Sequence, residues 1–197
     1  MSYMFHGSHI EGITSLKPRS VLHGSDKKVV WLTGNIPYAL IYIWDGEHNN
    51  LRREKHVTAW VKDGMAYYEE QFPNQLEAFY KGVSGYLYHI AQKQNIKAYE
   101  NRDSMYYCAD EVTVEKVSFV SDVYDELLRY EQKGEFRVRR FNEQTAERQR
   151  ELTELMATAI LRDDFCEGDE EKAEFYKMYF EKSWEIAKEL KGKGYDK

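Results

Sequence analysis

The sequence predicts an α+β fold, with a mixed domain over residues 1–141 followed by an acidic helical hairpin over residues 142–197. In the first region, short β-rich runs bounded by turn signals alternate with apolar residues at helical spacing. After residue 141, only the helical spacing continues. The chain contains 12 glycines and 3 prolines, so no stretch has the composition of a flexible linker.

Two strands and a helix are predicted near the start of the chain. Residues 3–6 and residues 29–33 are β-rich, and a glycine follows each run. Asn35 can cap a helix that has Pro37 in its first turn. Apolar residues continue at helical spacing until Asp45 and Gly46, which end the helix.

Between residues 57 and 141 the pattern is mostly that of strands. Asp63 and Gly64 separate two β-rich runs, which is a strong hairpin signal. Ser121 or Asp122 caps a helix that extends to Glu131. The other predicted elements are the hairpin strands 57–61 and 65–69, a helix over 74–81, strands over 85–90, 104–108 and 111–120, and an edge strand over 136–141.

The tail predicts two helices, over residues 143–162 and 169–191, packed as an antiparallel pair. Tyr176, Phe180 and Trp184 lie on one face of the second helix. We expect this face to be buried, since aromatic residues of that size would otherwise form an exposed patch typical of interaction sites. The hairpin is expected to pack on the first domain or on a partner, which is a second copy of the chain or another protein.

Charge is unevenly distributed along the chain. The net charge is -6, of which residues 142–197 contribute -5 and residues 1–141 only -1. Neither region has the basic field of a general nucleic-acid binder. The small basic group Arg137, Arg139 and Arg140 is interpreted as exposed positions on a strand.

The cysteines and the apolar runs predict a cytoplasmic protein. Cys108 and Cys166 are far apart and lack CxxC spacing, which is typical of free thiols in a reducing compartment. The N-terminal residues show no signal-peptide pattern. The longest apolar run, from Tyr38 to Trp44, is too short to span a membrane.

Four short motifs contain the candidate functional residues. The first places an imidazole at the end of a strand beside a glycine, which allows a ligand to approach the backbone closely. His9 follows His6 at HxxH spacing but has no acidic or cysteine partner, so no metal site is expected. His23, His48, His56 and His89 are assigned to the surface or the core. The motifs are His6-Gly7-Ser8, Val30-Trp31-Leu32-Thr33 followed by Ala39 and Tyr42, Gly85-Tyr86-Leu87-Tyr88, and Asp110-Glu111-Val112.

The order of these motifs resembles that of the ADP-ribosyltransferase superfamily, in particular its poly(ADP-ribose) polymerase and rifampin ADP-ribosyltransferase branches. In that superfamily a His-Gly-Ser/Thr step ends the first strand. A strand with an aromatic residue and a helix with a small residue and a tyrosine follow, and a later strand begins with a glutamate. The third motif is similar to the Arg-Val-Tyr strand of the rifampin-modifying branch. The resemblance covers roughly residues 3–125 and implies a split β-sheet core.

The resemblance also implies a substrate and residue roles. NAD would be the substrate, without a metal, and ADP-ribose would pass to an unknown acceptor. His6 would bond a ribose hydroxyl, Tyr42 would stack on nicotinamide, and Glu111 would bond the ribose 2′-hydroxyl. A carboxylate there would stabilise an oxocarbenium-like transition state. The implied catalytic residues are Glu111 and His6, and the implied NAD-binding residues are His6, Gly7, Ser8, Trp31, Thr33 and Tyr42.

Alternatives remain open at this point. Trp31 stands where the family places its first stacking tyrosine, and Asp110 and Glu115 lie close to Glu111. The chain could therefore be a non-catalytic binding or interaction module on the same fold. A related RNA enzyme that removes a 2′-phosphate is disfavoured by the near-neutral first region.

Overall fold

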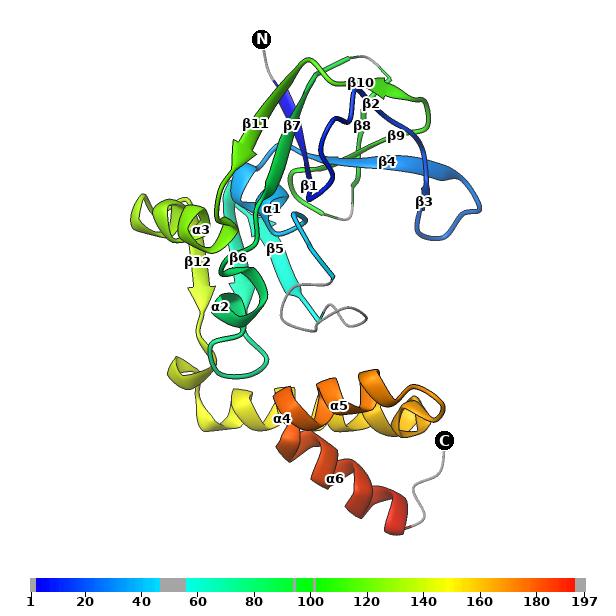
Figure 1. Ribbon diagram of the computed structural model, residues 1–197, viewed down its shortest axis with the longest axis vertical. Helices are drawn as coiled ribbons and strands as arrows, with labels where there is room; N and C mark the ends of the chain where they lie inside the picture. The colour runs from blue at the N-terminus through cyan, green and yellow to red at the C-terminus, as the bar shows by residue number, and fades with distance from the viewer. Residues whose placement is uncertain (1–2, 47–55, 94, 101, 194–197) are drawn as a thin grey trace. The chain divides into compact units, whose positions relative to one another are not determined.

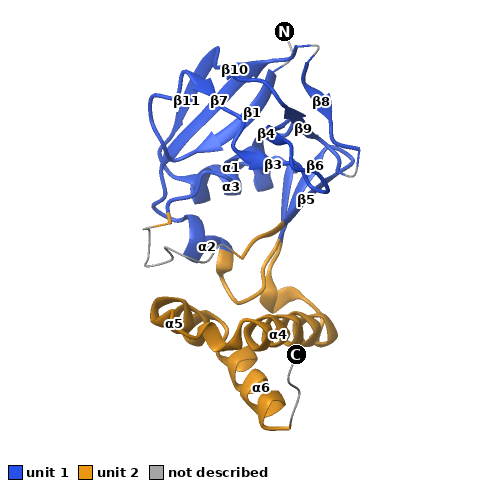
Figure 2. Ribbon diagram, turned by 90° about the vertical axis from the view of Figure 1, so that its right-hand side faces the viewer, with its two compact units in different colours: residues 1–45, 59–68, 76–138 blue, residues 46–58, 69–75, 139–197 orange. Residues whose placement is uncertain are grey.

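We describe a computed structural model of the 197-residue chain, which covers residues 3–46, 56–93, 95–100 and 102–193. Strands and helices both contribute, so the fold class is α+β, as predicted (Figure 1). The chain forms two compact units (Figure 2). Unit 1 comprises residues 1–45, 59–68 and 76–138, and unit 2 comprises residues 46–58, 69–75 and 139–197. The predicted boundary at residue 141 lies near residue 138, where the chain passes from unit 1 to unit 2 for the last time. The earlier segments 46–58 and 69–75 also belong to unit 2.

The main sheet of unit 1 has seven strands, all paired antiparallel in the order β11-β7-β1-β4-β9-β8, with β3 beside β4. The predicted strands 3–6, 29–33, 85–90 and 104–108 all lie in it. Figure 1 shows β11, β7 and β1 side by side. The strands are β1 (Tyr3–Ser8), β3 (Ser20–Val21), β4 (Lys28–Thr33), β7 (Gly85–Ala91), β8 (Lys97–Ala98), β9 (Met105–Cys108) and β11 (Lys116–Val120).

The sheet opens between β1 and β4. Strand β1 pairs with β7 along all six of its residues, from Tyr3 opposite Ala91 to Ser8 opposite Tyr86. With β4 it shares only the pair Phe5 and Thr33. Within the described residues, no backbone pair joins β1 to β4 beyond Phe5.

A two-stranded ribbon covers one face of the main sheet. It consists of β2 (Ser15–Leu16) and β10 (Val112–Thr113), which pair antiparallel. Leu16 and Val112 are buried in one cluster with Tyr88 and other apolar residues of the sheet. His6 is the cross-strand partner of Tyr88, and cross-strand partners share a face. The ribbon therefore covers the face that bears His6.

The predicted strand over 111–120 is wrong as a single element, because the chain changes sheets within it. Residues 112–113 form β10, and residues 116–120 form β11. Where the chain passes from one sheet to the other, the N–H of Val114 donates to the Thr14 carbonyl, and the N–H of Glu115 donates to the His89 carbonyl. These two bonds direct the backbone from the ribbon to the main sheet.

Helix α1 (Ile36–Leu40) packs against β1, and glycines allow the close approach. Asn35 caps the helix by accepting from the N–H of Tyr38 at 2.9 Å, as predicted. A Cβ on Gly7 would lie only 2.1 Å from the Ala39 carbonyl oxygen. The prediction that the helix continues to Asp45 is wrong. The N–H groups of Tyr42 and Ile43 bond carbonyls three residues back, which ends the α-helix in a tighter turn.

A three-stranded sheet of order β12-β6-β5 contains the predicted hairpin. Asp63 and Gly64 both have positive φ in its turn, as the sequence signal requires. Strand β12 is at the edge, as predicted, and Asp122 rather than Ser121 caps α3. The elements here are β5 (Thr58–Lys62), β6 (Met65–Glu69), α2 (Gln75–Tyr80), α3 (Val123–Gln132) and β12 (Phe136–Arg139).

The tail of unit 2 has three α-helices, α4 (Ala146–Arg162), α5 (Glu170–Tyr179) and α6 (Glu181–Gly192), with short 3-10 turns at Phe141–Glu143 and Asp164–Cys166. The prediction of one helix over 169–191 is therefore wrong. The backbone leaves the helical region at Phe180, with φ -128° and ψ 40°. The bend places the Phe180 ring against His56 and Phe72. Tyr176, Phe180 and Trp184 are buried, as predicted.

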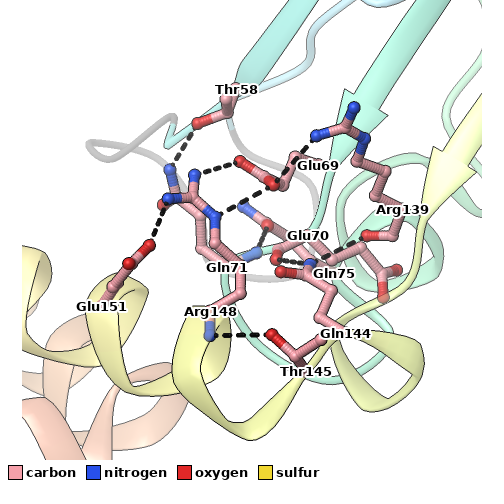
Figure 3. A network of polar contacts seen from close by, with 10 residues as sticks. All are labelled: Thr58, Glu69, Glu70, Gln71, Gln75, Arg139, Gln144, Thr145, Arg148 and Glu151. Carbon is pink, nitrogen blue, oxygen red and sulfur yellow. Dashed lines mark hydrogen bonds and ion pairs between the residues drawn. The ribbon is translucent and has the colours of Figure 1, made fainter.

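A polar network joins the start of α4 to other segments of unit 2 (Figure 3). The side chain of Glu69 is only 4% exposed and accepts two hydrogen bonds from the Arg148 guanidinium, at 3.3 and 2.7 Å. Arg139 lies 3.7 Å from the same carboxylate. The neighbouring Glu70 accepts from the N–H of Phe141 at 3.0 Å. These buried carboxylates are thus compensated by charge-assisted and backbone hydrogen bonds.

Candidate functional site

A pocket of about 290 Å³ lies where β1 and β4 separate. Both strands, α1 and the loop between β8 and β9 contribute to its wall, so residues far apart in the sequence meet there. Among the sequence-predicted residues, His6, Gly7, Trp31, Thr33 and Tyr42 line it, and Ser8 and Glu111 do not. The other lining residues are Phe5, Ser20, His23, Leu32, Tyr38, Ala39, Tyr99, Arg102 and Met105.

The His6 ring has one nitrogen fixed by the protein. Its Nδ1 lies 3.1 Å from the Trp31 carbonyl oxygen, which can only accept, so Nδ1 carries the hydrogen. Burial lowers the pKa of His6 below its usual value of 6.5, and the hydrogen bond to the Trp31 carbonyl raises it by less. The neutral ring is therefore favoured at neutral pH. A neutral ring with Nδ1–H has an acceptor lone pair at Nε2.

Tyr38 and Tyr42 form an aromatic pair on one side of the pocket. Their hydroxyl groups lie 3.1 Å apart, and their rings meet edge to face with centroids 5.4 Å apart. Burial and the neighbouring Tyr38 raise the pKa of Tyr42, so its phenol stays protonated at neutral pH. The Tyr42 residue is 46% exposed, so part of its surface is accessible to a ligand.

A second aromatic group surrounds Trp31. The Trp31 ring meets the Tyr99 ring edge to face at 5.1 Å and the Tyr107 ring at 6.1 Å. The His23 ring lies 6.0 Å from that of Trp31. Trp31, Tyr99 and His23 line the pocket, so aromatic rings contribute from more than one side. Such a wall suits a planar ring or an organic cation.

Two of the predicted residues have evident structural roles. Thr33 is 4% exposed, and its hydroxyl donates to the Ser104 carbonyl at 2.8 Å and accepts from the N–H of Asn35 at 3.1 Å. This side chain therefore fixes the start of α1. Gly7 allows α1 to approach β1 closely, which explains the need for glycine after His6 without reference to a ligand.

A second pocket, of about 380 Å³, shares His6, Ser20 and Trp31 with the first. Ser8 lines it, as do Ser15, Lys17 and Arg19. The Ser15 hydroxyl donates a hydrogen bond to the carboxylate of Glu111, which is exposed. Glu111 thus lies one side chain behind the wall of a pocket that contains His6.

The other two candidate carboxylates lie elsewhere. Asp110 accepts a hydrogen bond from Asn95 at 3.1 Å, and Glu115 is an exposed residue at the step between sheets. Neither lines either pocket. Of the three candidates, Glu111 is the one whose carboxylate bonds a residue of a pocket wall.

Several lining residues were not identified from the sequence. His23, which is assigned to the surface or the core, is exposed and also lines the first pocket, while His48 lies outside the described residues. Tyr38 precedes Tyr42 by one helical turn, a spacing that could have indicated it. Tyr99 and Arg102 come from a loop for which the sequence gives no signal.

Over the described part of the chain, no group of three or more His, Cys, Asp or Glu residues has the arrangement of a metal site. Within the same residues, no helix is long and apolar enough to cross a membrane.

Comparison with protein-family models, curated proteins and solved structures finds no match to this chain.

Proposed function

We propose that unit 1 binds NAD and cleaves its nicotinamide–ribose bond, as an ADP-ribosyltransferase-like domain. The observation that carries the proposal is the state of His6. Its ring is held by the Trp31 carbonyl with Nε2 as an acceptor, in a pocket with aromatic walls. An acceptor suits a ribose hydroxyl, and aromatic walls suit a nicotinamide ring.

The position of Glu111 is consistent with a catalytic role. The ribbon that carries Ser15 and Glu111 covers the sheet face that bears His6. A ribose bound to His6 would contact a residue that both pockets share, on the sheet face that the ribbon of Glu111 covers. Cleavage develops positive charge on the ribose, which a carboxylate stabilises. The acceptor of ADP-ribose is not identified by these residues.

The test measures nicotinamide release and the NAD-induced rise in melting temperature. Glu111→Gln removes the charge with little change of size, so it should lower release about a hundredfold, or roughly 3 kcal/mol. The thermal shift should be largely unchanged. Asp110→Asn is the matched control, because that carboxylate is adjacent and exposed but bonds Asn95, which lines neither pocket, instead of a residue of a pocket wall. Equal release by both variants would contradict the role of Glu111.

A second candidate is a non-catalytic NAD-binding module on the same fold. It is favoured by one observation: among the described residues, neither pocket has an Asp or Glu in its wall. This candidate predicts a thermal shift with NAD but no release of nicotinamide. Absence of both effects would exclude both candidates.

A further inference from the structure

Two cationic side chains line the second pocket. Lys17 and Arg19 flank Pro18, between β2 and β3. A residue before proline favours an extended backbone, and alternate residues of an extended chain point to the same side. Both Lys17 and Arg19 line the pocket.

Neither cation is neutralised by the part of the chain that the structure describes. Both residues are exposed, and no ion pair within residues 3–46, 56–93, 95–100 and 102–193 involves either of them. The described wall of this pocket contains no carboxylate. The carboxylate of Glu111 bonds the hydroxyl of Ser15, a residue of this wall.

Hydroxyl groups complete the polar side of the pocket. Ser8 and Ser20 line it with the two cations, and so does Ser15, whose hydroxyl already donates to Glu111. The Ser8 oxygen accepts from the N–H of Ile10 at 3.1 Å, which leaves its O–H free to donate to a ligand. Guanidinium, ammonium and hydroxyl donors around one space are the groups that bind phosphate oxygens.

We propose that the second pocket is a subsite for a phosphate or pyrophosphate group, held by Lys17 and Arg19. The walls of the two pockets share His6, Ser20 and Trp31, so the pockets adjoin each other. In this proposal, one molecule places a ring in the aromatic pocket and a phosphate in the basic one. Such a molecule is a phosphorylated nucleoside. The assignment of nicotinamide to the ring rests on the proposed function, whereas the phosphate subsite does not.

The first experiment measures binding of inorganic pyrophosphate to the full chain at low salt, by calorimetry. The double variant Lys17→Glu, Arg19→Glu should lose about thirtyfold in affinity, because two charge-assisted contacts become repulsive. The variant Lys93→Glu, Lys97→Glu is the control. It makes the same charge change at exposed residues of unit 1 that line neither pocket. Circular dichroism checks that each variant is folded.

The results separate the subsite from the proposed function. Loss of pyrophosphate binding in the first double variant alone supports the subsite, even if NAD then fails to bind. Undetectable binding by the wild-type chain overturns the subsite, as does equal binding by both double variants. Glu111→Gln should not weaken pyrophosphate binding, although it should lower nicotinamide release.

A second comparison links the subsite to the nucleoside. Nicotinamide mononucleotide differs from nicotinamide riboside by one phosphate. The mononucleotide should bind the wild-type chain about tenfold more tightly, and this preference should disappear in the Lys17→Glu, Arg19→Glu variant. A preference that persists in the variant would place the phosphate outside the second pocket and overturn the proposal.

Discussion

Replacing Gly7 by alanine tests the packing that shapes the first pocket. The new Cβ would lie 2.1 Å from the Ala39 carbonyl oxygen and 3.0 Å from Cγ1 of Ile43. Ordinary contact begins near 3.4 Å, so the oxygen would have to withdraw by about 1.3 Å. That oxygen belongs to the backbone of α1 and cannot rotate away. We therefore expect a cost near the upper end of overpacking effects, about 3 kcal/mol.

For a chain of this size, about 3 kcal/mol corresponds to a fall of roughly 6–12 °C in melting temperature. Gly34→Ala is the matched control, because its Cβ would meet only the Tyr106 ring, at 3.4 Å. Neither glycine has positive φ, so strain of that kind does not confuse the comparison. The control should change stability by less than about 0.5 kcal/mol. The reasoning fails if thermal unfolding of the two variants is the same.

Three further predictions concern other parts of the molecule. Lowering the pH from 8 to 5 should weaken NAD binding only below pH 6.5, because burial lowers the pKa of His6 and only its neutral ring accepts at Nε2. In the same pH range His6 should lower the stability of the folded chain, since the unfolded chain is protonated first. A pH series of thermal shifts measures both effects, and His6→Asn should remove them. Arg148→Met should cost about 3 kcal/mol in urea unfolding, because it removes the main partner of the buried Glu69, whereas Glu151→Gln at an exposed pair should cost less than about 1 kcal/mol. Trp184→Ala should destabilise the tail by about 3–5 kcal/mol in the same assay, because that residue is only 8% exposed, and a smaller loss than for Glu151→Gln would contradict its place in the core.

Local signals in the sequence were sufficient for much of the fold. Asn35 and Asp122 cap helices through hydrogen bonds to residues three positions ahead, and the Asp63-Gly64 turn needs only its own two residues. Such chemistry does not depend on distant segments. Long-range contacts determine where the helical backbone is interrupted, at Phe180. The apolar spacing continues through it, but the ring packs on His56 and Phe72, far away in the sequence.

The candidate site was predictable only where ordered motifs supplied its residues. His6, Trp31 and Tyr42 meet in one pocket, and the order of the family motifs had grouped them. Lys17 and Arg102 come from loops, whose place depends on how short strands pair. Two-residue strands such as β2 and β8 give almost no pattern in a sequence. The use of NAD as a substrate and a partner for the tail remain predictions.

The alternation of the chain between its two units has a consequence for synthesis on the ribosome. The segments 46–58 and 69–75 belong to unit 2, but most of that unit is the last part of the chain to be made. The His56 ring stacks on the Phe175 ring, which is synthesised about 120 residues later. At about 5–20 residues per second, the time between synthesis of the two residues is roughly 6–24 s. During this interval Phe72 also lacks its tail partners, so the aromatic contacts between the early segments of unit 2 and the tail form only after the tail is made.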